Sequence, residues 1–174
     1  LFQEIHHRLK NNLAIISSIL ELQAGKSNDP DFIRAIKDSQ RRIKTTALAH
    51  EVLYETDVLG AVDLSNFMEK LSNNVLESFI EENLRIKLKK HIDIQRMDID
   101  HAIPLGLIVN ELMTNSFKHA FPEKRNGEIE LNITQKGDDI QFNFSDNGIG
   151  LPTGFDVESI NSTGMIVIDS LIEQ

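Results

Sequence analysis

The sequence predicts an α+β protein in two parts, an antiparallel helical hairpin followed by an α/β sandwich. Two long apolar patterns with helical spacing occupy residues 1–55, and a polar break that contains Gly25 and Pro30 separates them. Past residue 84 short runs with strand alternation dominate, interrupted by one further helix that runs to Phe121. A helical part followed by a part that mixes helices and strands is typical of this fold class.

The composition excludes several classes of protein and site. The chain has 174 residues, a formal net charge of −9 and no cysteine. Without cysteine it can form neither a disulfide nor a thiolate metal site, which fits a reducing, cytoplasmic location. The negative charge argues against a nucleic-acid partner, because nucleic-acid-binding surfaces are basic. The sequence has no run of about 18 apolar residues, so we expect no membrane contact by this segment.

The hairpin is predicted from a helix over residues 1–24 and a second helix from Pro30 to about Glu55. The first helix has no capping signal, so we expect the chain to start inside a helix. Asp29 is placed to cap the second helix. The apolar row of the first helix is too wide for one partner helix to cover, and it comprises Ile5, Leu9, Leu13, Ile15, Ile16, Ile19, Leu20 and Leu22. We therefore predict a homodimer through residues 1–58 that forms a four-helix bundle.

One histidine of the first helix stands apart from that apolar row. At 100° per residue, His7 lies well outside it, whereas His6 lies at its edge. His7 shares its face with Glu4 and Asn11, three residues before it and four after it. An exposed histidine is largely neutral at pH 7, so His7 is a candidate nucleophile. The simpler interpretation is a pair of surface histidines on a bundle helix.

The segment between the hairpin and the sheet carries weaker signals. Residues 56–61 are predicted as a polar link, and Asp63 as the start of a helix that reaches Ile80. Ile86 and Leu88 alternate with basic residues, which predicts a half-buried strand. Asp100 is predicted to cap the next helix.

The helix that ends at Phe121 has two chemically different faces. Its apolar row includes Ser116, and the opposite face carries Glu111, Asn115, Lys118 and His119 at spacings of four, three and four. One helix therefore offers a carboxylate, an amide, an ammonium and an imidazole in one direction. A solvated surface helix would show the same residues without any ligand.

A second polar motif follows a predicted β-hairpin. Residues 128–134 and 140–145 alternate as strands, and the second strand runs into Asp146-Asn147-Gly148-Ile149-Gly150. Asp146 is placed to accept hydrogen bonds from an amino group, and Gly148 and Gly150 allow positive φ and close approach of a flat ligand. By itself this motif is most often a turn. Residues 151–161 are predicted as a loop, and Ser162, Thr163 and Gly164 open an apolar helix.

Taken together, these motifs resemble one known family. Asn110-Glu111-Leu112-Met113-Thr114-Asn115 with Lys118-His119, and Asp146 to Gly150, resemble the N box and first glycine box of the histidine-kinase branch of the GHKL ATPases. Ser162 and Gly164 resemble part of the second glycine box. The stretch from Glu4 to Asn12 resembles the phosphoacceptor helix of the H-H-R-x-K-N-N subfamily, the HisKA_2 or HWE-like sensor histidine kinases.

The resemblance implies a role for each of these residues. It implies that ATP is bound with its adenine amino group on Asp146, its phosphates near Lys118 and His119, and Mg²⁺ on Asn115. Glu111 would orient water or polarise the nucleophile, and the glycine boxes with Gly148, Gly150, Ser162 and Gly164 would line the nucleotide. The histidine before the arginine takes the phosphoryl group, which is His7, with Glu4 as a weak candidate base and Asn11 supporting transfer or the phosphatase direction. The implied partner is the receiver domain of a response regulator.

Two departures from the family pattern leave alternatives open. Arg8 stands where most histidine kinases have an acid, and the ATP domain of the family continues with two strands for which no sequence remains after Gln174. The division into residues 1–58 and a C-terminally incomplete ATP-binding domain at 61–174 rests on this comparison. The alternatives are an inactive or weakly active ATP-binding dimer that docks a response regulator, and a hydrolysing ATPase of the chaperone or mismatch-repair kind. The sensed signal, the regulator, transfer within or between protomers, and the balance of kinase and phosphatase activity are not encoded in these motifs.

Overall fold

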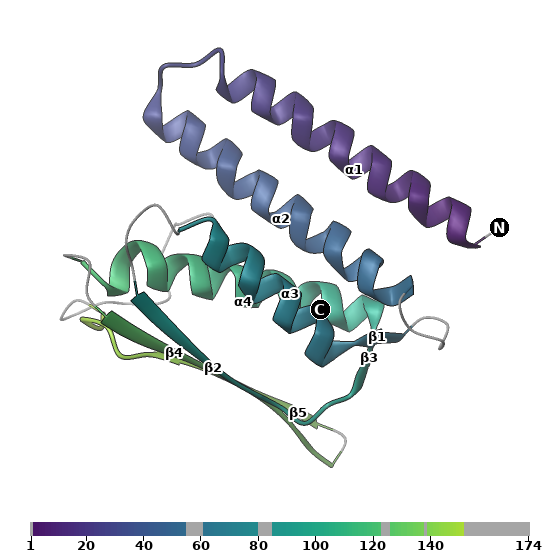
Figure 1. Cartoon of the computed structure of the whole chain (residues 1–174), viewed down its shortest axis with the longest axis vertical. Helices are drawn as coiled ribbons and strands as arrows, with labels where there is room; N and C mark the ends of the chain where they lie inside the picture. Colours follow the sequence, from purple (N-terminus) through teal and green to yellow (C-terminus); the bar gives the residue numbers. More distant parts are fainter. Residues whose placement is uncertain (1, 55–60, 80–84, 123–125, 138, 152–174) are drawn as a thin grey trace.

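The fold is described by a computed structural model that covers residues 2–54, 61–79, 85–122, 126–137 and 139–151. Side chains are described within these ranges from Arg8 onward, except for Tyr54. The molecule is layered: the hairpin lies over a pair of helices, and these lie over one face of a sheet (Figure 1). No helix within the described ranges is long and apolar enough to cross a bilayer.

The hairpin consists of α1 (Phe2–Ala24) and α2 (Pro30–Tyr54), as predicted. Asp29 caps α2, since its Oδ1 accepts from the backbone N of Asp31 at 3.0 Å. Lys10 Nζ of α1 lies 2.5 Å from Glu51 Oε2 of α2. This ion pair links the N-terminal part of α1 to the C-terminal part of α2.

A small two-stranded sheet connects the hairpin to the next layer, and the sequence did not predict it. Strand β1 (Ala61–Asp63) pairs antiparallel with β3 (Arg96–Asp98), with Val62 opposite Met97. Both of these side chains are buried. Three residues provide only one inward-facing position, which is too short a pattern to recognise in the sequence.

Two helices form the middle layer, α3 (Leu64–Glu77) and α4 (Ile99–Asn115). Asp63 caps α3 as predicted, with its Oδ1 2.9 Å from the backbone N of Asn66. The predicted cap of α4 was wrong: Asp98 is the capping residue, and its Oδ1 accepts from the N of Asp100 at 3.1 Å. The helix begins earlier because strand β3 delivers Asp98 directly to its first turn.

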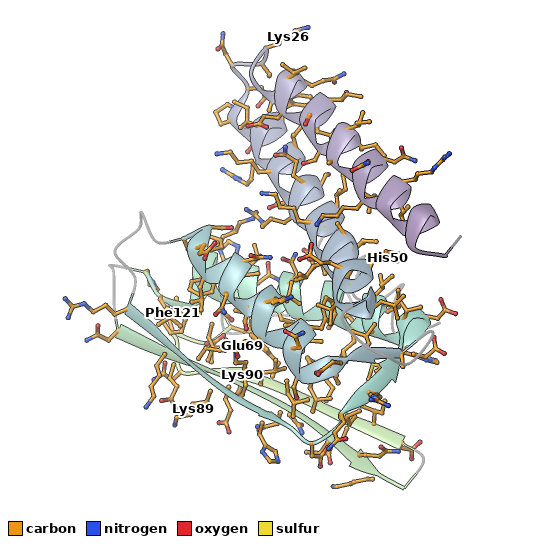
Figure 2. The ribbon with its side chains drawn as sticks, turned by 45° about the vertical axis from the view of Figure 1, so that its right-hand side comes forward. Lys26, His50, Glu69, Lys89, Lys90 and Phe121 are labelled. Carbon is orange, nitrogen blue, oxygen red and sulfur yellow. The ribbon has the colours of Figure 1, made fainter. Side chains whose placement is uncertain are left out.

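The sheet has the order β2-β4-β5, formed by β2 (Arg85–Ile92), β4 (Asn126–Lys136) and β5 (Asp139–Asp146). Strands β2 and β4 are parallel, and β4 and β5 form the predicted antiparallel hairpin. An ion pair between Lys90 of β2 and Glu69 of α3 ties the sheet to the middle layer (Figure 2). The hydrogen bond from Lys90 lowers the pKa of Glu69 below its usual value.

One hydrophobic core runs from α2 through the middle layer to the sheet. Leu48, Ala49 and Val52 of α2 are buried in the same cluster as the inward side chains of α3, α4 and β4. The helices approach closely at Gly106 of α4, where an added Cβ would lie 2.5 Å from Phe67 Cζ and 3.3 Å from Thr45 Cγ2. The absence of a side chain at Gly106 therefore lets three helices meet at one point.

We expect Gly106→Ala to destabilise the protein by about 1–3 kcal/mol, because the fully buried Phe67 ring cannot move aside without disturbing its neighbours. Urea unfolding followed by circular dichroism measures the change. Gly25→Ala is the matched control, since its Cβ would lie 3.6 Å from the nearest atom, which is ordinary contact. If Gly106→Ala were as stable as Gly25→Ala, the close approach would not limit packing.

Candidate functional site

Helix α4 continues into a π-helical turn, η2 (Ser116–Ala120), and most of the predicted polar residues lie on these two elements. From Ala102 to Asn115 no residue is exposed, because α2, α3 and the sheet together enclose the helix. His119 is exposed and so is Lys118 as a whole residue, although the Lys118 side chain is only 25% exposed, and Asn115 is half-buried. The predicted polar face is therefore only partly exposed to solvent. Its charged side chains Glu111 and Lys118 lie toward α2.

Glu111 is the clearest case, since its side chain is only 8 % exposed and forms an ion pair with Arg42 of α2. The distance from Arg42 Nε to Glu111 Oε1 is 2.8 Å. This hydrogen bond is the main reason that the pKa of Arg42 lies above its usual value, and burial acts against it. Removing either partner would leave the other charge buried and unpaired, which is costly.

Lys118 makes a second contact with α2. Its Nζ lies 3.0 Å from Asp38 Oδ1 and 3.2 Å from Asp38 Oδ2. Arg41 also forms an ion pair with Asp38, so one carboxylate is shared by two cations. Sequence reasoning missed Asp38, Arg41 and Arg42, because nothing local links α2 to residues of α4 and η2 that are 69 and 80 positions away.

Asp146, at the end of β5, is held in place by two hydrogen bonds. Ser116 Oγ donates to its Oδ2 at 2.8 Å, and the backbone N of Gly148 donates to its Oδ1 at 2.9 Å. Each carboxylate oxygen keeps a further lone pair for another donor. Ser116 was predicted only as part of the apolar row, and it is buried as expected, but its hydroxyl orients the predicted adenine-binding carboxylate.

The turn after Asp146 is docked against the end of η2. The backbone N of Ile149 donates to Ala120 O at 3.0 Å, and Asn147 Oδ1 accepts from the N of Glu128 at 2.7 Å. An added Cβ on Gly148 would lie 2.4 Å from Ala120 O, so a side chain there would push the turn away from the helix.

The two glycines of this turn differ from the prediction and from each other. Gly150 has φ of 73°, as expected, and an added Cβ there would meet nothing within 4 Å. The prediction of positive φ was wrong for Gly148. Glycine is required there because the turn packs closely on its neighbours. Thus, of these two glycines, Gly150 is the one with open space beside it and a backbone conformation that favours glycine.

The N-terminal end of α1, which contains the candidate phosphoacceptor His7, lies far along the hairpin from the residues of α4 and η2. His7 and Glu4 are within the helical backbone of α1, but their side chains lie outside the described residues, as do Ser162 and Gly164. Asn11 is exposed. Lys10 is level with Glu51 of α2, whereas Lys118 is level with Asp38. These positions on α2 are separated by 13 residues, a rise of about 20 Å, and Figure 1 shows the N-terminus and the end of α4 at opposite sides.

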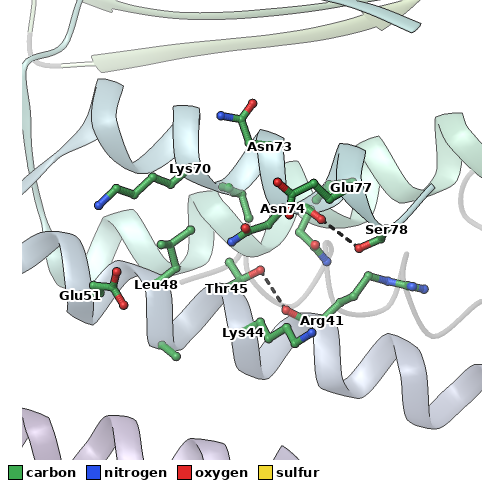
Figure 3. Close-up of a pocket in the computed structure, with 14 residues that line it drawn as sticks. Arg41, Lys44, Thr45, Leu48, Glu51, Lys70, Asn73, Asn74, Glu77 and Ser78 are labelled. Carbon is green, nitrogen blue, oxygen red and sulfur yellow. Dashed lines mark hydrogen bonds between the residues drawn. The ribbon is translucent and has the colours of Figure 1, made fainter. Parts of the chain in front are cut away.

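A separate cavity of about 680 Å³ lies between α2 and α3 (Figure 3). The sequence contained no indication of it, because its walls combine α2 and α3 with Asn110 of α4, and no local pattern links these three helices. It does not include Lys118 or Asp146. Polar residues that line it include Arg41, Lys44, Lys70, Asn73, Asn74 and Asn110, together with apolar surface from residues such as Leu48, Leu71 and Val75.

Two family models match consecutive segments of this chain. The model described as histidine kinase matches residues 4–79. The model described as histidine kinase-, DNA gyrase B- and HSP90-like ATPase matches residues 100–163, which include the cluster at the end of α4. The chain belongs to the histidine kinases.

Curated proteins that are similar to this histidine kinase are also named histidine kinases. The sensor histidine kinase PdtaS of Mycobacterium tuberculosis is 29% identical over 171 residues, which cover 98% of this chain and 34% of that protein. Blue-light-activated histidine kinase 2 of Erythrobacter litoralis is 25% identical over 179 residues, covering 98% of this chain and 49% of that protein. The chain thus spans about a third of the length of the PdtaS relatives that it matches.

A solved structure supports the fold. The histidine kinase domain of the Erythrobacter litoralis EL346 blue-light-activated histidine kinase superposes with a TM-score of 0.69 at 22% identity, covering 98% of this chain and 79% of that chain. The predicted α+β fold, a helical part followed by a sheet-and-helix ATPase domain, is therefore confirmed.

The site residues of this histidine kinase suit ATP and Mg²⁺ chemically. The ATPase family match implies ATP binding, and a nucleotide needs both an acceptor such as the oriented Asp146 carboxylate and a donor such as the Lys118 ammonium. Within the described ranges no group of three or more histidines, aspartates and glutamates forms a metal cluster. Asn115 offers one amide oxygen, which fits Mg²⁺ because this ion keeps water and phosphate oxygens as most of its ligands.

We expect Ser116→Ala to weaken nucleotide binding about two- to tenfold, since Asp146 loses the side-chain donor that orients it. Calorimetric titration with Mg²⁺ and a non-hydrolysable ATP analogue measures the effect. Ser18→Ala is the control, because the Ser18 hydroxyl bonds only to Ala14 O of its own helix. Unchanged affinity in Ser116→Ala would show that this hydrogen bond does not orient the binding carboxylate.

Proposed function

We propose that this chain is the core of a sensor histidine kinase that transfers the terminal phosphoryl group of ATP to His7 and then to an aspartate of a response regulator. Residues 1–58 would serve as the dimerisation and phosphotransfer hairpin, and residues 61–174 as the ATP-binding domain, in a cytoplasmic setting. The observation that carries the proposal is the cluster at the end of α4, where Ser116 orients Asp146 beside a turn packed onto η2. The family matches on both parts of the chain support it.

In this proposal the residues around α4 hold the nucleotide. Asp146 accepts a hydrogen bond from the adenine amino group, and Gly150 lets the ring approach the backbone. Lys118 and His119 neutralise the phosphates, with Ser162 and Gly164 of the second glycine box providing backbone donors. Phosphoryl transfer needs mainly positioning and neutralisation of charge, which these groups supply.

Mg²⁺ would be held by Asn115 and would neutralise charge on the phosphates. Glu111 would polarise the nucleophile or orient water. Its present hydrogen bond to Arg42 keeps the carboxylate in one orientation on the side of α4 that faces the hairpin.

His7 is the proposed nucleophile. A neutral imidazole nitrogen attacks the terminal phosphorus, the bond from that phosphorus to the bridging oxygen breaks, and ADP leaves with the electron pair. Glu4 is the proposed proton acceptor and Asn11 the residue that supports transfer or orients water in the reverse direction. Because the two sites are offset by about 20 Å along α2, the hairpin and the ATP-binding elements must change their relative position before transfer.

A second copy of the chain is the proposed partner of the hairpin. Ile15, Ile19 and Leu22 of α1 are 58%, 50% and 67% exposed, and together with Ile16 they form a continuous apolar surface. Packing this surface against a second hairpin would complete a four-helix bundle.

The kinase activity is tested by incubating the full-length protein with Mg²⁺ and ATP labelled at the terminal phosphate. We expect acid-labile, alkali-stable label on the protein, retained in His6→Ala and lost at least a hundredfold, to background, in His7→Ala, because only His7 lies outside the apolar row. His7→Ala should still bind nucleotide.

Two other outcomes would contradict this proposal. A wild-type protein that binds nucleotide but takes no label would favour a module that docks a response regulator without making phosphohistidine. Release of phosphate at an equal rate in wild type and His7→Ala would favour a hydrolysing ATPase.

The dimer is tested by adding charge to the apolar surface of α1. We expect Ile19→Lys to weaken self-association by about tenfold or more, because a buried unpaired ammonium opposes packing. Sedimentation equilibrium measures the dissociation constant. Ala14→Lys adds the same charge at an exposed position on another side of α1 and should leave it unchanged. Equal dissociation constants for the two variants would exclude this surface as the interface.

A further inference from the structure

Two ion pairs join the hairpin to the candidate nucleotide site, and both use residues to which the proposed function gives a role. Asp38 and Arg42 are four residues apart on α2 and therefore share a face of that helix. They contact Lys118 and Glu111 respectively. The hairpin thus binds the predicted phosphate-binding ammonium and the predicted polarising carboxylate at the same time.

The Asp38 carboxylate contacts Lys118 in the way an anionic ligand would. Both carboxylate oxygens lie within 3.2 Å of the Lys118 Nζ. The side chains of Lys118 and Asp38 are only 25% and 27% exposed, so solvent screens the pair less than it would at an open surface. Because Arg41 pairs with the same carboxylate, Asp38 offsets the positive charge of Lys118 in part from within the chain.

A phosphate group that reaches Lys118 would meet this carboxylate. Two anions at one ammonium repel each other, and the repulsion is stronger where water is partly excluded. Either the phosphate binds weakly beside Asp38, or Asp38 gives up the contact. In both cases the carboxylate lowers the affinity of the site for phosphates.

We propose that Asp38 competes with the phosphates of the nucleotide for Lys118, so that nucleotide binding and the contact between α2 and η2 oppose each other. This inference rests on the proposed function, in which Lys118 binds phosphate. Because coupling between two binding events is reciprocal, nucleotide weakens the Asp38 contact by the same factor by which Asp38 weakens nucleotide binding. The nucleotide thereby loosens one of the two ion pairs that hold α4 and η2 at their present level on α2.

The test is the dissociation constant of a non-hydrolysable ATP analogue with Mg²⁺, measured by calorimetry on the full-length protein. We expect Asp38→Asn to bind the analogue about two- to fivefold more tightly than wild type, the range of a partly exposed ion pair. Asp38→Glu keeps the carboxylate and should bind much as wild type does. Asp38→Ser serves as a second neutral variant if Asp38→Asn fails to fold.

Asp31→Asn is the control for net charge. It removes the same charge from the same helix, but among the described residues Asp31 forms an ion pair with Arg34 alone, and its side chain is 86% exposed. We expect its affinity for the analogue to equal that of wild type.

The outcomes separate this inference from the proposed function. Tighter binding confined to Asp38→Asn or Asp38→Ser supports competition at Lys118. Equal tightening in Asp31→Asn, or measurable binding with no difference among the variants, overturns the competition and leaves the proposed function standing. Absence of nucleotide binding in every variant and in wild type overturns the proposed function and the competition with it.

Discussion

The enclosure of α4 is the constraint on which the rest of this structure depends. The helix packs on α2, α3 and the sheet at once, and the side-chain-free position at Gly106 brings α2 and α3 close enough to do so. A charged group on an enclosed helix needs a partner inside the protein, because burying a charge unpaired is costly. The pairing of Glu111 with Arg42 follows directly from this requirement. In a helix open to solvent on one side, Glu111 would need no partner from α2.

The same constraint explains why one part of the site is enclosed and another part is exposed. The part of α4 up to Asn115 is enclosed, whereas Lys118 and His119 of η2 are exposed at its end. The turn at Gly148 packs on Ala120 and closes this end, so that Asp146 and Gly150 are presented beside the exposed residues. A rigid helix therefore supplies the position, and its last turn supplies the groups that a ligand can reach.

Much of the fold could be predicted from the sequence because it rests on local, periodic signals. Helices α1 and α2, the β4–β5 hairpin and the cap at Asp63 all appear where spacing and turn chemistry place them. Short strands β1 and β3 and the true cap at Asp98 were missed, because each depends on pairing with a distant segment.

For the site, the sequence identified residue types better than their surroundings. The motifs pointed to Glu111, Lys118 and Asp146, but a helical wheel treats the face opposite the core as solvent. The structure places α2 on that face instead. A helical wheel contains no information about a residue that is 69 positions away in the sequence. Ser116 shows the opposite case. Its burial was expected, but the hydrogen bond from its hydroxyl to Asp146 of strand β5 was not. The roles of these residues stay predictions.

Helix α2 belongs to two layers, and this has a consequence for how the molecule opens. Its C-terminal half, with Leu48, Ala49 and Val52, is part of the common core, whereas its N-terminal half is held mainly by α1 and by polar contacts such as Asp38 with Lys118. Amide hydrogens of the first half should exchange with solvent through local opening events, and those of the second half only when the core itself unfolds. A single continuous helix would then show a boundary in hydrogen-exchange protection at its middle, near Thr45, with no break in its backbone.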